Sequence, residues 1–163
     1  MTQIVFATMP DSARVWVFGA GVPVTGAPAR ALLAAVDEHL AQWTAHGAPL
    51  SCARDWRDNQ FLAIAVDEAA HGASGCSIDG LFRVLTHLER EIGTSMVESG
   101  TVFWRDTDGQ VTAAARHAFK AAARDGTVRQ DTPVFDTMID TVGAWRERFE
   151  RPAAESWHRA LFS

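Results

Sequence analysis

The residues with the clearest chemical potential lie in one short stretch, Ser74-Gly75-Cys76-Ser77-Ile78-Asp79. An apolar run from Phe61 to Val66 precedes it, and a run with helical spacing from Ile78 to Ile92 follows it. We therefore expect a strand, a loop and a helix in this order. The first N–H groups of a helix bind anions and lower the pKa of a nearby thiol. This pattern predicts a small-molecule or anion site at the strand–loop–helix junction around Cys76.

In this interpretation Cys76 is a thiol nucleophile or a ligand group, and the amides of Ser77 and Ile78 hold an anion. A nucleophile of this kind needs a base and an orienting carboxylate. The candidate bases are His46, His71 and His158, and the candidate carboxylates are Asp67 and Glu68 at the end of the apolar strand. The predicted catalytic residues are Cys76, His71 and Asp67. The predicted ligand-binding residues are Ser74, Gly75, Ser77, Asp79, Glu68, His46, Trp157 and His158.

The alternative is a plain helix cap, in which Ser77 is the N-cap residue and Cys76 packs. Known reaction motifs do not fit the spacing. The phosphatase loop needs an arginine six positions after its cysteine, and that position is Phe82. A zinc site needs paired histidine or cysteine spacings, which the chain lacks. We therefore expect no metal.

A glycine-rich turn at Gly19-Ala20-Gly21 invites a nucleotide-binding interpretation. The next glycine is Gly26, so the dinucleotide pattern is not met, and the single lysine, Lys120, lies outside any Walker A pattern. The sequence predicts an ordinary turn here, no cofactor and no P-loop ATPase.

Three arginines, Arg54, Arg57 and Arg105, fall on neighbouring predicted strands. They are either an anion-binding face or the partners of carboxylates such as Asp55 and Asp58. The sequence leaves both interpretations open.

The chain has 163 residues, a net charge of −5 and 47% apolar residues, which indicates one folded domain. Fourteen of its fifteen basic residues are arginines, without a basic cluster, so we expect no nucleic-acid partner. No apolar run approaches the roughly 20 residues of a membrane span. The N-terminus lacks the features of a signal peptide. Two cysteines do not make a disulfide framework, so we expect a cytoplasmic protein with reduced thiols.

The hydrophobic pattern predicts the order β-α-β-β-α-β, that of an α+β ferredoxin-like sandwich. An added hairpin, a helix and a C-terminal tail would extend it. We expect a single domain, 1–163, with an extended lead-in at 1–12 and a tail at 152–163 that packs on the body. The expected strands are 13–18, 50–56, 60–66, 101–105, 110–112 and 133–139, and the expected helices are 28–45, 78–92, 113–125 and 142–149. The strand at 60–66 is apolar on both faces, which predicts a central position.

Four segments together resemble a known group: Trp43 to Gly47, Phe61 to Glu68, Ser74 to Asp79 and Ser156 to His158. They are similar to the small bacterial proteins commonly labelled "ABC transporter ATPase". This chain has no Walker A motif and no transporter signature, so the resemblance implies no ATPase activity and no catalytic residue. It implies that the four segments, with His46, Asp67-Glu68, Cys76 to Asp79 and Trp157-His158, are hallmark positions.

The second hypothesis for function is a non-catalytic adaptor or regulatory module. In that case the Trp157-His158 tail and exposed aromatic side chains bind a partner or a second copy of the chain, and Cys76 merely packs. A homodimer is the expected form of this module.

Overall fold

The structure, a computed structural model, describes residues 5–45, 48–49, 51–67 and 75–162, with the backbone alone at 44–45, 48–49 and 75–77. These residues form a mixed α+β fold with a three-stranded and a four-stranded antiparallel sheet, as the predicted class requires. A short pair, β2 (Thr44–Ala45) and β3 (Ala48–Pro49), is separate from both sheets. No described helix is long and apolar enough to cross a membrane.

The first sheet has the order β1-β5-β4, and its strands are β1 (Arg14–Gly19), β5 (Phe61–Asp67) and β4 (Ser51–Arg57). The central strand is buried on both faces, from Phe61 to Val66, which confirms the prediction made from its apolar run. Asp58 and Asn59 turn the chain between β4 and β5 with positive φ angles of 55° and 56°. Aspartate and asparagine adopt this backbone more readily than other residues with a side chain.

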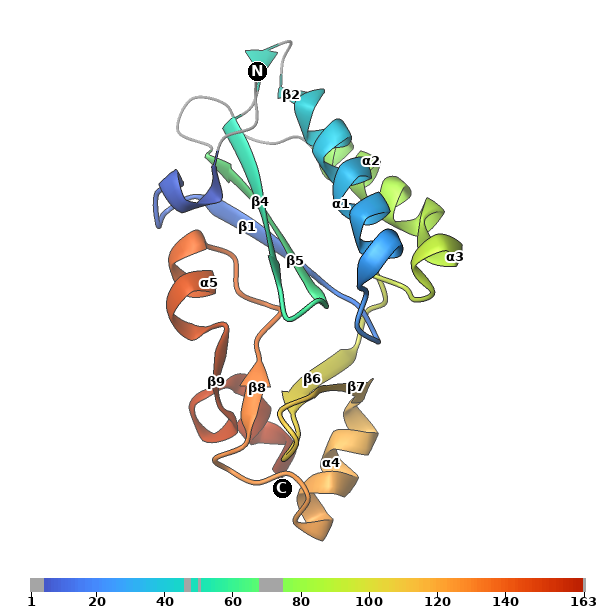
Figure 1. The fold of residues 1–163 in the computed structure, drawn as a ribbon. Coiled ribbons are helices and arrows are strands. Elements are labelled where there is room, and N and C mark those ends of the chain that lie inside the picture. Colours follow the sequence, from blue (N-terminus) through green and yellow to red (C-terminus); the bar gives the residue numbers. More distant parts are fainter. Residues whose placement is uncertain (1–4, 46–47, 50, 68–74, 163) are drawn as a thin grey trace.

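Helices cover one face of this sheet (Figure 1). They are α1 (Gly26–Ala41), α2 (Gly75–His87) and α3 (Glu89–Ile92). The single helix predicted at 78–92 is thus interrupted at Leu88, and Gly93 ends it in the left-handed conformation, with φ of 81°. The other face of the sheet meets the 3-10 helix η1 (Phe6–Thr8) and α5 (Val142–Arg148).

The second sheet has the order β7-β6-β8-β9. Its strands are β7 (Val111–Ala115), β6 (Thr101–Arg105), β8 (Pro133–Phe135) and β9 (Glu150–Pro152). The alanine-rich run predicted as a helix from 113 begins its helix, α4 (Arg116–Asp125), three residues later, because its first residues pair with β6. Two 3-10 helices, η2 (Ala153–Glu155) and η3 (Trp157–Phe162), end the chain, and η3 packs on α4.

The ferredoxin-like topology is not confirmed. The order β1-β5-β4, with α1 connecting β1 to β4 and β5 between them, is the split βαβ arrangement that this fold contains. The strand after α2 should close the same sheet, but β6 belongs to the second sheet. The outer edge of β1 instead meets the segment before α5, where Val15 N donates to Asp140 O at 2.9 Å.

A cluster of aromatic rings joins the two sheets. The ring of Phe61 lies 5.0 Å from Phe103, 4.8 Å from Phe135 and 5.0 Å from Phe149, measured between centroids. Gly19 borders this cluster, and a Cβ atom there would come within 2.5 Å of the Phe103 ring. The glycine of the predicted turn therefore makes room for an aromatic ring between the sheets.

Candidate functional site

A pocket lies beside β4, α5 and η1 and reaches Arg54 at the edge of the first sheet. Figure 1 shows α5 and η1 on the face of this sheet opposite α1 and α2. Side chains alternate along a strand, so Ala53, Asp55 and Arg57 of β4 share this face. Trp145 of α5 packs against it and is 2% exposed. The short helix is oriented by its N-cap, because the hydroxyl of Thr141 accepts a hydrogen bond from Ala144 N at 3.1 Å.

Asp55 is fixed by two hydrogen bonds. The indole Nε1 of Trp145 donates to Oδ2 at 2.9 Å, and the backbone N–H of Trp56 donates to Oδ1 at 2.9 Å. Among the residues that the structure describes, no basic side chain forms an ion pair with Asp55. The carboxylate therefore has spare acceptor positions at the pocket wall.

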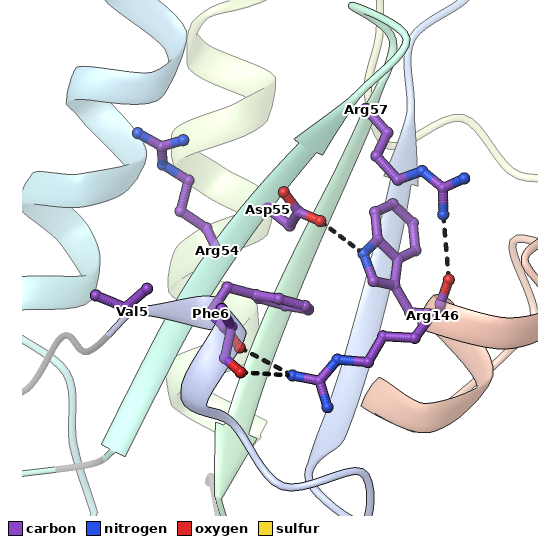
Figure 2. A pocket seen from close by; sticks show the side chains of 8 residues that line it. Val5, Phe6, Arg54, Asp55, Arg57 and Arg146 are labelled. Atoms are coloured by element: carbon purple, nitrogen blue, oxygen red, sulfur yellow. Dashed lines mark hydrogen bonds between the residues drawn. The ribbon is translucent and has the colours of Figure 1, made fainter.

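Arg57 lies on the same indole ring. Its Cζ atom is 5.1 Å from the Trp145 ring centroid and 5.1 Å from that of Phe149, and its Nη1 donates to Trp145 O at 3.1 Å (Figure 2). A guanidinium has five N–H donors, so most of them stay available. Within the described part of the chain, Arg57 forms no ion pair with a carboxylate.

Arg146 holds η1 in place, and η1 forms the third wall of the pocket beside β4 and α5. Its Nη1 lies 2.6 Å from Asp11 Oδ1, and its Nη2 donates to Met9 O at 2.9 Å and to Phe6 O and Ala7 O at 3.2 Å. These bonds fix η1 against α5, with the Phe6 ring turned toward the pocket (Figure 2). Arg146 is thus a structural cation whose charge is balanced by Asp11.

The resulting pocket has a volume of about 720 Å³. Small-molecule sites usually enclose about 300–1,000 Å³. Among the described residues, its lining contains no hydroxyl, thiol, imidazole or amine side chain. The lining residues are Val5, Phe6, Ala7, Arg54, Asp55, Arg57, Trp145 and Arg146. Apart from the carboxylate of Asp55, the described lining offers groups for recognition and no nucleophile for covalent catalysis.

The other two arginines of the predicted anion-binding face are engaged. Arg54 forms a two-bond ion pair with Asp37 of α1, at 2.8 and 3.0 Å, and this hydrogen bonding raises the pKa of Arg54. Arg105 bonds both carboxylate oxygens of Glu150, at 2.7 and 3.0 Å, and also Asp58 at 3.2 Å. These contacts, Glu150 foremost, raise the pKa of Arg105. Of these three arginines, Arg57 alone keeps its charge for a ligand.

The predicted site around Cys76 lies between the end of β5 and the start of α2. β5 ends at Asp67 and α2 begins at Gly75, three residues before the predicted start at Ile78. Cys76 and Ser77 therefore lie in the first turn of the helix, and not in the loop before it and at its N-cap as predicted. Asp67 is half-buried and pairs with Ser51 of β4, and Asp79 is exposed on α2. The side chains of Cys76 and Ser77, and all of Ser74, Glu68, His71 and His46, lie outside the described residues.

His158 is described fully, and it is buried. Its Nδ1 lies 2.8 Å from Ser156 Oγ, its ring stacks on Trp157 at 4.0 Å, and its Nε2 has no hydrogen-bond partner among the described residues. Burial lowers the pKa of His158 to about 4, so the ring is neutral at pH 7. Its helix η3 lies against α4, at the other end of the molecule from α2 (Figure 1). The structure therefore does not bring His158 to Cys76.

The Ser156–His158 pair is also not a hydrolytic dyad. A catalytic histidine needs a second group that stabilises the imidazolium it becomes. Here the far nitrogen of the ring is unpartnered and the ring of Phe119 lies 5.8 Å away. The pair instead fixes the end of the chain to α4.

Fold and site together define a mixed α+β protein with a charged, aromatic-lined pocket between its first sheet and α5. No family model, no curated protein and no solved structure matches the chain. Reasoning from the sequence missed Trp145, Phe6 and Arg146 as parts of this pocket. One signal was present: the charged residues Arg54, Asp55 and Arg57 on a predicted strand beside one that is apolar on both faces.

Proposed function

We propose that this protein is a non-catalytic regulatory module that binds a small polar ligand in the pocket between β4, α5 and η1. One observation carries the proposal: Asp55 and Arg57 stand two residues apart on one strand, both held by the indole of Trp145, and do not pair with each other. Opposite charges that are fixed apart beside a cavity are prepared for a ligand rather than for each other.

The composition of the pocket supports binding over catalysis. Asp55 is its single carboxylate and the remaining described lining is arginine or apolar. A covalent mechanism needs a nucleophile with a base within hydrogen-bond reach, and a general acid–base mechanism usually needs two titratable groups. The described lining offers neither combination.

The adaptor hypothesis drawn from the sequence relied on the Trp157-His158 tail and on exposed aromatic side chains. His158 is 0% exposed and bonded to Ser156, so its ring is not available to a partner. The proposed module therefore rests on the pocket, and the tail serves the stability of α4 and the second sheet.

The proposal is tested by ligand-dependent thermal stabilisation and calorimetric titration with a fixed set of probes: L-leucine, L-phenylalanine, acetate, inorganic phosphate and propylamine. Binding to the folded state raises the melting temperature. We expect at least one probe to stabilise the wild type and the control Arg124→Gln, whose side chain is exposed on α4. The same probe should bind at least 10-fold more weakly to Arg57→Gln or, if it is propylamine, to Asp55→Asn. Equal binding by that variant, or no binding of any probe, would overturn the proposal.

A further inference from the structure

We infer that the ligand of this pocket is a zwitterion of the α-amino acid type, whose carboxylate binds Arg57 and whose ammonium group binds Asp55. This inference rests on the proposed binding function and names its ligand class. It follows from the charges, the spacing and the apolar wall of the pocket.

The charge balance favours a ligand with both charges over a ligand with one. Arg54 forms its ion pair with Asp37 and Arg146 with Asp11. The charges of the described lining that form no ion pair are therefore Asp55, whose charge also acts on Arg54, and Arg57. A simple anion would gain the attraction of Arg57 but suffer the repulsion of Asp55, and a simple cation would meet the reverse. A ligand with both charges satisfies both groups.

Asp55 and Arg57 lie two residues apart on one face of β4. Residues two apart on one face of a strand have Cα atoms about 6.6 Å apart. The nitrogen and the carboxylate carbon of an α-amino acid are about 2.5 Å apart, from standard bond lengths and angles. With a hydrogen bond of about 2.9 Å at each end, the zwitterion spans roughly 8 Å. Because Asp55 and Arg57 both contact the one indole of Trp145, we expect a ligand of this reach to contact both charged groups.

The fork of Arg57 suits a carboxylate. Its Nη1 bonds Trp145 O at 3.1 Å and its plane is held over the Trp145 and Phe149 rings, which orients the remaining N–H groups. Arginine binds carboxylates through two parallel hydrogen bonds when its plane is fixed in this way. Asp55 is likewise fixed by two donors, which leaves its other acceptor positions for an ammonium group.

The apolar residues Val5, Phe6 and Ala7 favour a ligand with an apolar side chain. Val5 is 68% exposed and lies with Phe6 and Ala7 along the pocket. Burying such apolar surface favours a ligand with an aliphatic or aromatic side chain. We therefore expect leucine or phenylalanine to bind more tightly than aspartate or lysine.

Calorimetric titration with L-leucine, N-acetyl-L-leucine and L-leucinamide tests the inference, because each derivative removes one charge. We expect L-leucine to bind the wild type at least 10-fold more tightly than either derivative. In Asp55→Asn, whose amide oxygen still accepts from Trp145, the preference over N-acetyl-L-leucine should fall below about 2-fold. In Arg57→Gln the preference over L-leucinamide should fall in the same way. Each preference is a ratio on one protein, so a general loss of stability in a variant cancels.

The outcomes separate the inference from the function on which it rests. Wild-type binding of N-acetyl-L-leucine or L-leucinamide as tight as that of L-leucine would overturn the zwitterion while the binding function stands. Preferences unchanged in both variants would also overturn it. Failure of all three compounds, together with phosphate, acetate and propylamine, would overturn the binding function itself.

Discussion

The indole Nε1 of Trp145 donates a hydrogen bond of 2.9 Å to Asp55, a residue 90 positions earlier in the chain. The same ring lies 5.1 Å below the guanidinium of Arg57, measured from Cζ to the ring centroid. One aromatic side chain of a seven-residue helix thus positions both charges of the pocket.

Trp145→Phe should lower the free energy of unfolding by about 2–4 kcal/mol. The change removes a hydrogen bond to a charged acceptor, worth about 1–3 kcal/mol, and leaves unfilled volume in the core. Urea unfolding measures the effect. Trp16→Phe is the matched control. Trp16 is half-buried, and its ring makes a cation–π contact with Arg14 at 4.7 Å. Equal losses in the two variants would contradict a special role for Trp145.

The stability of the protein should fall as the pH decreases from about 6.5 to about 4. His158 titrates near pH 6.5 when unfolded and near 4 when folded, because burial disfavours its charged form. The unfolded state therefore binds more protons in this window, and the free energy of unfolding drops by up to roughly 3 kcal/mol. Urea midpoints at pH 7 and pH 4.5 measure the drop.

His158→Leu should lose most of this pH dependence, whereas His117→Gln should keep it, because His117 is exposed on α4. If His158→Leu retained the wild-type slope between pH 6.5 and pH 4, another group would be responsible and the assignment to His158 would be wrong.

Arg105→Gln should destabilise the protein by about 1–2 kcal/mol. Arg105 ties β6 to Glu150 of β9 and to Asp58 in the turn after β4, so it connects the two sheets. Two-bond arginine–carboxylate pairs exceed the usual worth of an exposed ion pair. The control is Arg129→Gln, because Arg129 is 73% exposed and 3.8 Å from Asp131. Its change should lie within about 0.5 kcal/mol of zero. A zero effect at both positions would refute the connecting role.

Alkylation of Cys76 tests the junction that the sequence singled out. Cys52 is buried, with its Sγ 3.5 Å from Leu40 O, and Cys52→Ala leaves Cys76 as the one thiol. If the first turn of α2 activates Cys76, its rate of reaction with iodoacetamide should rise with an apparent pKa well below the ordinary value of about 8.5. An unshifted pKa, or no reaction in the folded protein, would leave Cys76 a packing residue.

Local sequence was sufficient for most elements of the first sheet. The apolar run at 61–66 predicted the central strand, and Asp58-Asn59 predicted the turn before it. The sequence could not indicate that β6 joins a different sheet from β5, because both strands are short and apolar. The place of β6 depends on the aromatic contacts of Phe61. Its partners Phe103, Phe135 and Phe149 are spread over the second half of the chain.

The pocket was harder to predict from the sequence, because it too depends on contacts between residues far apart in the chain. Arg57 was recognised as a candidate anion ligand, but its difference from Arg54 and Arg105 depends on contacts with distant carboxylates. Asp37, Glu150 and Trp145 lie 17, 45 and 88 positions from the arginines that they contact. No local pattern encodes such pairings.

The most direct measurement is the indole N–H resonance of Trp145 in a two-dimensional NMR titration with L-leucine. The signal is assigned by its loss in Trp145→Phe. Because the proton of Nε1 is donated to Asp55, an ammonium group that binds this carboxylate should shift the resonance saturably in the wild type and far less in Arg57→Gln. A resonance that stays unmoved at saturating L-leucine, or that shifts equally in Arg57→Gln, would contradict a zwitterion site built on Asp55, Trp145 and Arg57.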